Sequence, residues 1–178
     1  MIAILITIMV LELKAPHEAT LAALMSVLPV FLSYVLSFVY LGIYWNNHHN
    51  MMRAVRSVTG GILWANLHLL FWLSLVSFAT AWMGENHFAP LPMALYGVML
   101  LAASLAFLLL QTAIVRHEGP GSAFVRSLGS NAKGKVSPVL YVTGIALAFV
   151  NPWLSGACYV AVAAMWVVPD TRFQAVSE

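Results

Sequence analysis

Long apolar runs separated by short polar stretches occupy nearly the whole of this 178-residue sequence. Hydrophobic residues make up 62% of the chain and charged residues only 8%, whereas a soluble domain carries about 25% charged residues. A helix needs roughly 20 apolar residues to cross a bilayer, so the length allows about five or six spans. The alternating pattern of an outer-membrane barrel is absent. The sequence therefore predicts an all-α integral membrane protein.

Six apolar segments alternate with polar or proline-containing turns and predict a single six-helix transmembrane domain over residues 1–178. The predicted spans cover residues of about 1–13, 21–45, 60–83, 92–115, 138–150 and 157–168. Pro29 predicts a kink in the second span. We expect the longest loop over residues 116–137 and a tight turn over residues 151–156.

The basic residues lie almost entirely on one side of these spans. Lys14 is on the opposite side from the other seven, which are Arg53, Arg56, Arg116, Arg126, Lys133, Lys135 and Arg172. Because basic loops stay in the cytoplasm, six spans predict that both termini are cytoplasmic. Glu12, Glu18 and Glu85 would then face outward.

The first predicted helix carries an apolar stripe. Ile4, Ile8 and Leu11 share one helical face, Thr7 lies on its flank, and Glu12 lies one position beyond it. Several copies around a symmetry axis would form a narrow apolar tube with a ring of carboxylates at one mouth, which is an arrangement that can conduct ions. Periodicity alone nevertheless favours packing of the stripe against the chain's own helices, since apolar stripes usually belong to a core.

Polar residues at the end of the second span and inside the third predict a structural cluster formed by Asn47, His48, His49, Asn66 and His68. Adjacent histidines point about 100° apart on a helix, and cysteine and carboxylate residues are distant in sequence, so we expect no metal site. Polar groups inside a span normally face the bundle, which predicts interhelical hydrogen bonds or support for the pore helix. Imidazoles also titrate near neutral pH, which leaves a pH-sensing role open.

The motifs of common enzymes are missing from the sequence. It contains no serine–histidine–aspartate set, phosphate loop or Cys-x-x-Cys motif, so we expect no enzymatic activity, no cofactor and no nucleic-acid partner. The alternative to a channel is a proton-coupled or small-solute transporter, in which His48, His49 and His68 would carry protons. A third interpretation is a membrane scaffold without transport activity.

Three blocks of sequence carry a resemblance to a known family. They are residues 4–13 (ILITIMVLEL), 42–49 (GIYWNNHH) and 63–75 (LWANLHLLFWLSL), the last followed by Phe78-Ala-Thr80. Together they resemble the potassium channels of the transmembrane protein 175 family, which comprises the lysosomal channel and its bacterial relatives. The family's first helix opens with an Arg-x-x-x-Phe-Ser-Asp motif just before the stretch seen here. The resemblance therefore implies a bacterial member with a truncated or late start, whose missing motif would contact the polar cluster.

The resemblance also implies a function. It implies a homotetramer in the bacterial inner membrane, with a pore lined by the first helix. Ile4, Ile8 and Leu11 would form the constriction, with Ile4 as its narrowest layer and Thr7 as a supporting hydroxyl near it. Glu12 would concentrate cations at the outer mouth. The permeant ion would be K⁺, with other monovalent cations or protons as further candidates, and selectivity would be modest because the pore has no carbonyl filter.

Overall fold

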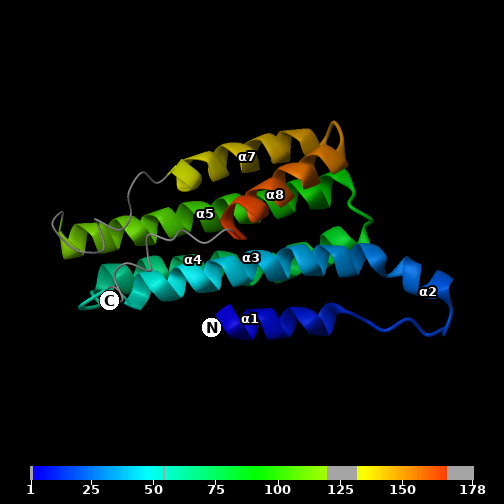
Figure 1. Ribbon diagram of the computed structural model, residues 1–178, viewed down its shortest axis with the longest axis horizontal. Coiled ribbons are helices and arrows are strands. Elements are labelled where there is room, and N and C mark those ends of the chain that lie inside the picture. The colour runs from blue at the N-terminus through cyan, green and yellow to red at the C-terminus, as the bar shows by residue number, and fades with distance from the viewer. Residues whose placement is uncertain (1, 54, 120–131, 168–178) are drawn as a thin grey trace.

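The computed structural model describes residues 2–53, 55–119 and 132–167, and the regular elements within these ranges are all helices. They are α1 (Ile2–Met9), the 3₁₀ helix η1 (Val10–Glu12), α2 (Leu21–Ser26), α3 (Leu28–Arg53), α4 (Gly60–Glu85), α5 (Pro90–Glu118), α7 (Ala132–Ala148) and α8 (Pro152–Val167). The long helices lie side by side and alternate in direction along the chain (Figure 1). Helix α1 contacts α3 and α4, whereas α7 and α8 pack on α5 and on each other.

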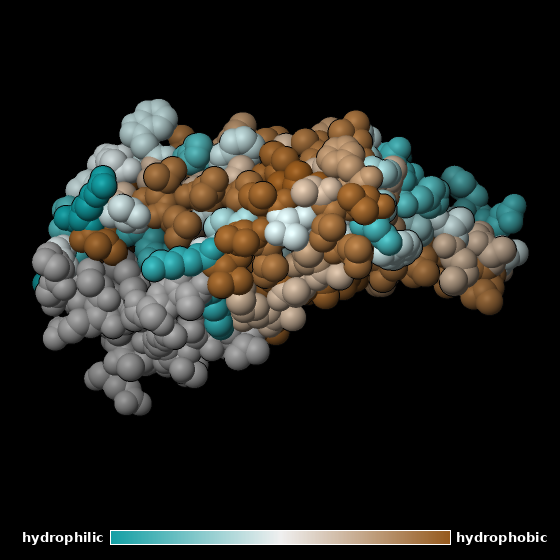
Figure 2. Space-filling model, turned by 90° about the horizontal axis from the view of Figure 1, so that it is seen from above, coloured by the Kyte–Doolittle hydropathy of each residue, from teal (hydrophilic) through white to brown (hydrophobic). Residues whose placement is uncertain are grey.

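The lengths and composition of the helices fit a membrane. Helices α3, α4 and α5 are each long and apolar enough to cross a bilayer, and Ile2–Glu12 and Pro152–Val167 form shorter apolar helices. Apolar residues gather along the middle of the face shown in Figure 2, and hydrophilic residues lie toward its two ends. The predicted all-helical membrane class is confirmed, whereas the number of spans and the cytoplasmic termini stay predictions.

The second predicted span, over residues 21–45, begins where α2 begins, at Leu21, but the helix is interrupted near its start and continues beyond the predicted end. The chain breaks at Val27 between α2 and α3, and Pro29 lies in the first turn of α3. Proline has no N–H group and its ring crowds the carbonyl four residues earlier, so it is tolerated in a first turn and ends a helix that precedes it. At the other end, α3 continues through the asparagine–histidine block to Arg53.

The connections on either side of α7 are shorter than predicted. Residues 132–137, which we expected in a loop, form the first part of α7, where the Ser137 hydroxyl donates to the Lys133 carbonyl oxygen over 2.8 Å. The predicted turn over residues 151–156 is also wrong, because α8 begins at Pro152. The Asn151 side chain accepts a hydrogen bond from the Trp153 backbone N–H at 2.9 Å, and asparagine before a first-turn proline is a strong helix start. Arg126, Val168 and Arg172 lie outside the described residues.

A buried hydroxyl network joins α3, α4 and α5. The Ser37 hydroxyl lies 2.6 Å from the Thr80 hydroxyl and 2.9 Å from the Tyr96 hydroxyl. The Thr80 hydroxyl also donates to the Val76 carbonyl oxygen of its own helix at 2.6 Å. Because hydrogen bonds are directional, this network fixes the axial register of the three helices as well as their contact.

Tyr159 attaches α8 to the rest of the bundle. Its hydroxyl donates to the Met93 carbonyl oxygen at 3.1 Å, and its backbone carbonyl accepts a hydrogen bond from the Tyr40 hydroxyl at 2.6 Å. Its ring is fully buried and lies where Gly97 and Gly144 present no side chain. The bundle formed by α3, α4, α5, α7 and α8 is therefore one packed body, against which α1 rests.

Candidate ion-conducting face

Helix α1 has one face packed on the bundle and one face open. Ile2 and Met9 are only 4% and 2% exposed, and they pack in the core. The predicted stripe lies on the other face, with Ile4 57%, Ile8 46% and Leu11 75% exposed and Thr7 also exposed. The expectation that the stripe packs against the chain's own helices is therefore wrong.

The open face continues onto α4. An apolar hollow of about 420 Å³ lies between the two helices and is lined by Ile4, Leu5, Leu67, Leu70, Phe71 and Ser74. The Ser74 hydroxyl donates to the Phe71 carbonyl oxygen of its own helix at 2.7 Å. The surface beside Ile4 is consequently carbon-rich and is not covered by the rest of the described chain.

Two polar groups accompany the stripe. The Thr7 hydroxyl donates to the Ile4 carbonyl oxygen at 2.8 Å, so its proton is engaged and its remaining lone pairs can face a cation. Glu12 is exposed at the end of η1, where the last backbone carbonyls of the helix also concentrate negative charge. Both groups are suited to attract cations to this face.

The predicted polar cluster is divided among several contacts. His48 Nε2 lies 2.6 Å from Asn66 Oδ1, which joins α3 to α4 between two half-buried residues. Asn47 donates to the Ile43 carbonyl oxygen at 2.8 Å, and the His49 ring stacks on Trp45 with ring centroids 5.7 Å apart. These residues share the end of α3, but their side chains do not all meet.

His68 points away from the bundle, contrary to the expectation for a polar residue inside a span. It is exposed and accepts a hydrogen bond from the Trp72 indole N–H at 3.2 Å. It lies two positions after Asn66, which corresponds to about 200° around a helix, so both side chains cannot face the same neighbour. His48, His49 and His68 thus have different partners, and the contacts found give no continuous path for protons between them.

Residues that hold the helices together were missed in the sequence. Ser37, Thr80 and Tyr96 form the buried network, and none of them was predicted to join helices because isolated hydroxyls are common in apolar helices. The spacing of Ser33, Ser37, Tyr40 and Tyr44 at intervals of three or four residues is the signal that could have shown a polar face on α3. In the part of the chain that the structure describes, His, Cys, Asp and Glu residues do not gather in threes that could hold a metal ion.

Comparisons with known proteins agree with this architecture. The sequence model of the endosomal/lysosomal potassium channel TMEM175 matches residues 1–76. A potassium channel of Chryseobacterium sp. (strain P1-3) is 48% identical over 173 residues, which cover 97% of this chain and 90% of that protein. A potassium channel of Chamaesiphon minutus is 29% identical over 175 residues, covering 89% of this chain and 84% of that protein.

A solved structure extends the match to three dimensions. The crystal structure of a lysosomal potassium-selective channel TMEM175 homolog from Chamaesiphon minutus has a TM-score of 0.82 to this chain at 27% identity. The match covers 95% of this chain and 92% of that one, so it includes the second half, where the sequence blocks gave little information. The long, 48% identical alignment and this shared fold lead to one conclusion: the chain belongs to the TMEM175 family of potassium channels.

Proposed function

We propose that this chain is a passive potassium-permeable channel, and not an enzyme, in which four copies surround a pore lined by α1. The observation that carries the proposal is the open face of α1, where Ile4, Ile8 and Leu11 stay exposed while Ile2 and Met9 are buried. A helix that packs on its own bundle through one face and leaves a second apolar face open can line a pore on the symmetry axis of several copies. The names of the relatives, which are potassium channels, support K⁺ as the permeant ion.

Conduction through such a pore depends on the cost of removing water from the ion. Rings of Ile4, Ile8 and Leu11 would narrow the pore, and these side chains offer no oxygen atoms to replace lost water ligands. K⁺ is larger and more weakly hydrated than Na⁺, so it would pass more easily. The resulting selectivity is modest, and other monovalent cations or protons are candidates for slower permeation. Thr7 would offer lone pairs near the constriction, and Glu12 would raise the cation concentration at the outer mouth.

The proposed topology has six spans, with both termini in the cytoplasm of a bacterial inner membrane. Arg53 ends α3 and Arg116 lies in the last turn of α5, and these two helix ends lie at the same end of the bundle (Figure 1). Glu85, at the end of α4, lies at the opposite end. This distribution agrees with the positive-inside rule.

Ion flux from liposomes tests the proposal directly. Purified protein in K⁺-loaded liposomes should release K⁺ passively, without a pH gradient and without saturation by substrate. Ile4→Asn should raise cation flux and lower the preference for K⁺ over Na⁺, because the amide would ligate a partly dehydrated ion.

The matched control is Val160→Asn on α8, since Val160 is 54% exposed against 57% for Ile4. We expect this variant to conduct as the original chain does. If Ile4→Asn leaves flux and selectivity unchanged, the constriction is assigned wrongly. Uptake that saturates and follows a pH gradient would instead support a transporter.

A further inference from the structure

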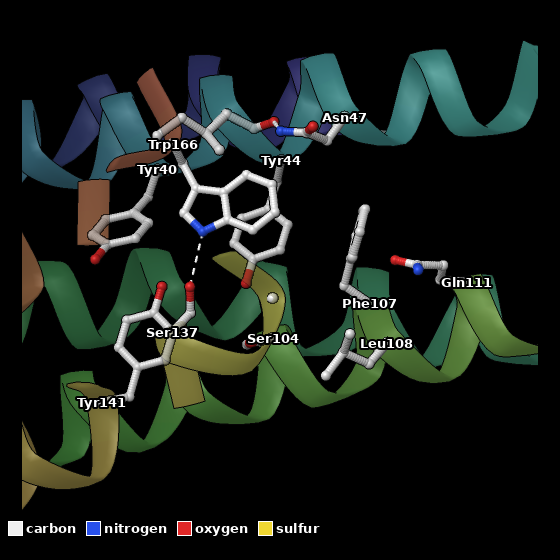
Figure 3. Close-up of a pocket in the computed structure, with 12 residues that line it drawn as sticks. Tyr40, Tyr44, Asn47, Ser104, Phe107, Leu108, Gln111, Ser137, Tyr141 and Trp166 are labelled. Atoms are coloured by element: carbon white, nitrogen blue, oxygen red, sulfur yellow. Dashed lines mark hydrogen bonds between the residues drawn. The ribbon is translucent and has the colours of Figure 1, made fainter. Parts of the chain in front are cut away.

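A pocket lies inside the bundle between α3, α5, α7 and α8, away from α1 (Figure 3). Its volume is about 40 Å³. A single water needs roughly 10–15 Å³ on this measure, so the pocket holds about three atoms of that size. It therefore has room for a very small molecule.

Two hydroxyl groups open on this pocket without a partner in the part of the chain that the structure describes. They belong to Tyr44 and Ser104, each only 9% exposed. Figure 3 shows both side chains among those that surround the pocket. Buried polar groups are almost always hydrogen-bonded, and a cavity walled only by carbon stays dry. These hydroxyls consequently indicate an occupant that offers hydrogen bonds.

Three other polar residues around the pocket are already engaged. The Trp166 indole N–H donates to the Ser137 hydroxyl at 2.8 Å, and this hydroxyl donates to the Lys133 carbonyl oxygen at 2.8 Å. The Asn47 amide donates to the Ile43 carbonyl oxygen. The half-buried Gln111 also lines the pocket without a hydrogen bond among the described residues, but Tyr44 and Ser104 are the more deeply buried groups with free hydrogen-bonding capacity.

The walls of the pocket restrict the charge of its occupant. Phe107 lies edge-on to Tyr44, with ring centroids 6.0 Å apart, and Leu108 adds aliphatic surface. None of the described lining residues carries a charge. An ion would therefore lose its hydration here without a counter-charge from these residues.

We propose that this pocket binds a small neutral amphiphile of about three or four non-hydrogen atoms, of the class of short-chain alcohols. Its hydroxyl would bond to Tyr44 and Ser104, and its alkyl carbons would pack on Phe107 and Leu108. The site lies apart from the α1 stripe, and the proposal does not depend on ion conduction.

Binding is tested by ¹⁹F NMR with 2-fluoroethanol as the probe and the full chain in detergent micelles. We expect saturable line broadening beyond that of empty micelles, with a Kd on the order of millimolar, since few atoms supply limited affinity. Ethanol should compete for the site. The cationic probe 2-fluoroethylammonium should show no saturable binding, and equal binding of both probes would overturn the neutral site even if no variant folded.

Variants locate the binding. Tyr44→Phe combined with Ser104→Ala removes both hydroxyls and should weaken binding roughly tenfold. Tyr34→Phe is the matched control on α3, because Tyr34 does not line the pocket, and it should bind as the original chain does. Equal binding by the double variant, or the absence of saturable binding in the original chain, contradicts the proposal. An experimental density map of the chain with the alcohol that shows only water at the two hydroxyls would also contradict the proposal.

Discussion

The His48–Asn66 hydrogen bond spans 2.6 Å between half-buried groups on α3 and α4, the two helices on which α1 rests. Interhelical hydrogen bonds in membranes contribute only about 0.6 kcal/mol on average, because the unfolded chain in lipid also finds partners. The contact therefore fixes the relative position of two helices more than it stabilises the fold.

A double-mutant cycle measures this contact. We expect His48→Ala and Asn66→Ala to show a coupling of about 0.5–1 kcal/mol in reversible unfolding in mixed micelles. Asn86→Ala is the control, since the Asn86 side chain donates to the Trp82 carbonyl oxygen of the helix that it caps, and it should show no coupling with His48. If His48 and Asn86 showed a coupling as large as that of His48 and Asn66, the cycle would report a general loss of structure and not this contact.

At the residue scale, the sequence was enough to identify the unusual polar residues, but not to predict which groups their side chains contact. Asn66 and His68 were both expected to face the bundle, and only Asn66 does. Helical geometry separates them by about 200°, but it does not say which of the two faces inward. That choice depends on the neighbouring helix, whose position the sequence does not give.

Gly97 and Gly144 govern the packing of α5 and α7 around Tyr159. A Cβ atom at Gly97 would lie 2.7 Å from Ile145 Cγ1 and 2.8 Å from Tyr159 Cζ, and one at Gly144 would lie 2.5 Å from Tyr159 Cε1. Both glycines let an aromatic ring approach a helix backbone, which is a common role of small residues in membrane bundles.

Alanine substitution tests this role. Gly97→Ala should destabilise the bundle by about 1–3 kcal/mol, because the ring of Tyr159 and the helices around it must shift. Gly42→Ala, also within a helix, meets no atom within 4 Å and should stabilise α3 by about 0.5–1 kcal/mol through helix propensity. Unfolding in mixed micelles measures both changes, and equal effects at the two positions would argue against the assigned packing.

The two faces of α1 give a test with adjacent residues. In a Cys158→Ala background, Ile8→Cys should react with a bulky, membrane-impermeant thiol reagent and lose most of its K⁺ flux. Met9→Cys should keep its flux, since Met9 is 2% exposed and packs in the core, whereas Ile8 is 46% exposed. Block at position 9 without block at position 8 would place the opposite face of α1 on the pore.

Among the elements, sequence located the long helices well and their junctions poorly. Helices α4 and α5 extend the predicted spans over residues 60–83 and 92–115 by a few residues at most. The break at Val27 and the early starts of α7 and α8 were missed. Hydropathy responds to apolar content, whereas a helix start depends on local bonds such as the one from Trp153 to Asn151.

For the whole molecule, the apolar composition was enough to predict a helical membrane protein, but not to separate its core from its outer surface. In lipid both kinds of surface are apolar, so the usual contrast between inside and outside is lost. Phe78 is 61% exposed and Val76 is 1% exposed on the same helix, although both are apolar. The open stripe of α1 was therefore visible only once the bundle was assembled.

The proposed topology predicts opposite labelling of two exposed residues in intact cells. Glu85→Cys, at the end of α4, should react with an impermeant maleimide added outside, after Cys158→Ala removes the native thiol. Lys135→Cys, near the start of α7, should react only after the membrane is opened. The reverse pattern would mean that the chain has the opposite orientation in the membrane. Labelling of both positions from outside would contradict an odd number of membrane crossings between residues 85 and 135.

The contrast between α1 and the rest of the molecule has a mechanical consequence. The Ser37–Thr80–Tyr96 network clamps α3, α4 and α5 through directional bonds. The hydrogen bonds that α1 makes within the described residues stay inside its own segment. Ile2 and Met9 hold α1 on the bundle by apolar packing, without hydrogen bonds. Such contact resists separation but yields readily to sliding or twisting. A gating motion that rotates α1 against the bundle would thus leave the hydrogen bonds between α3, α4 and α5 intact.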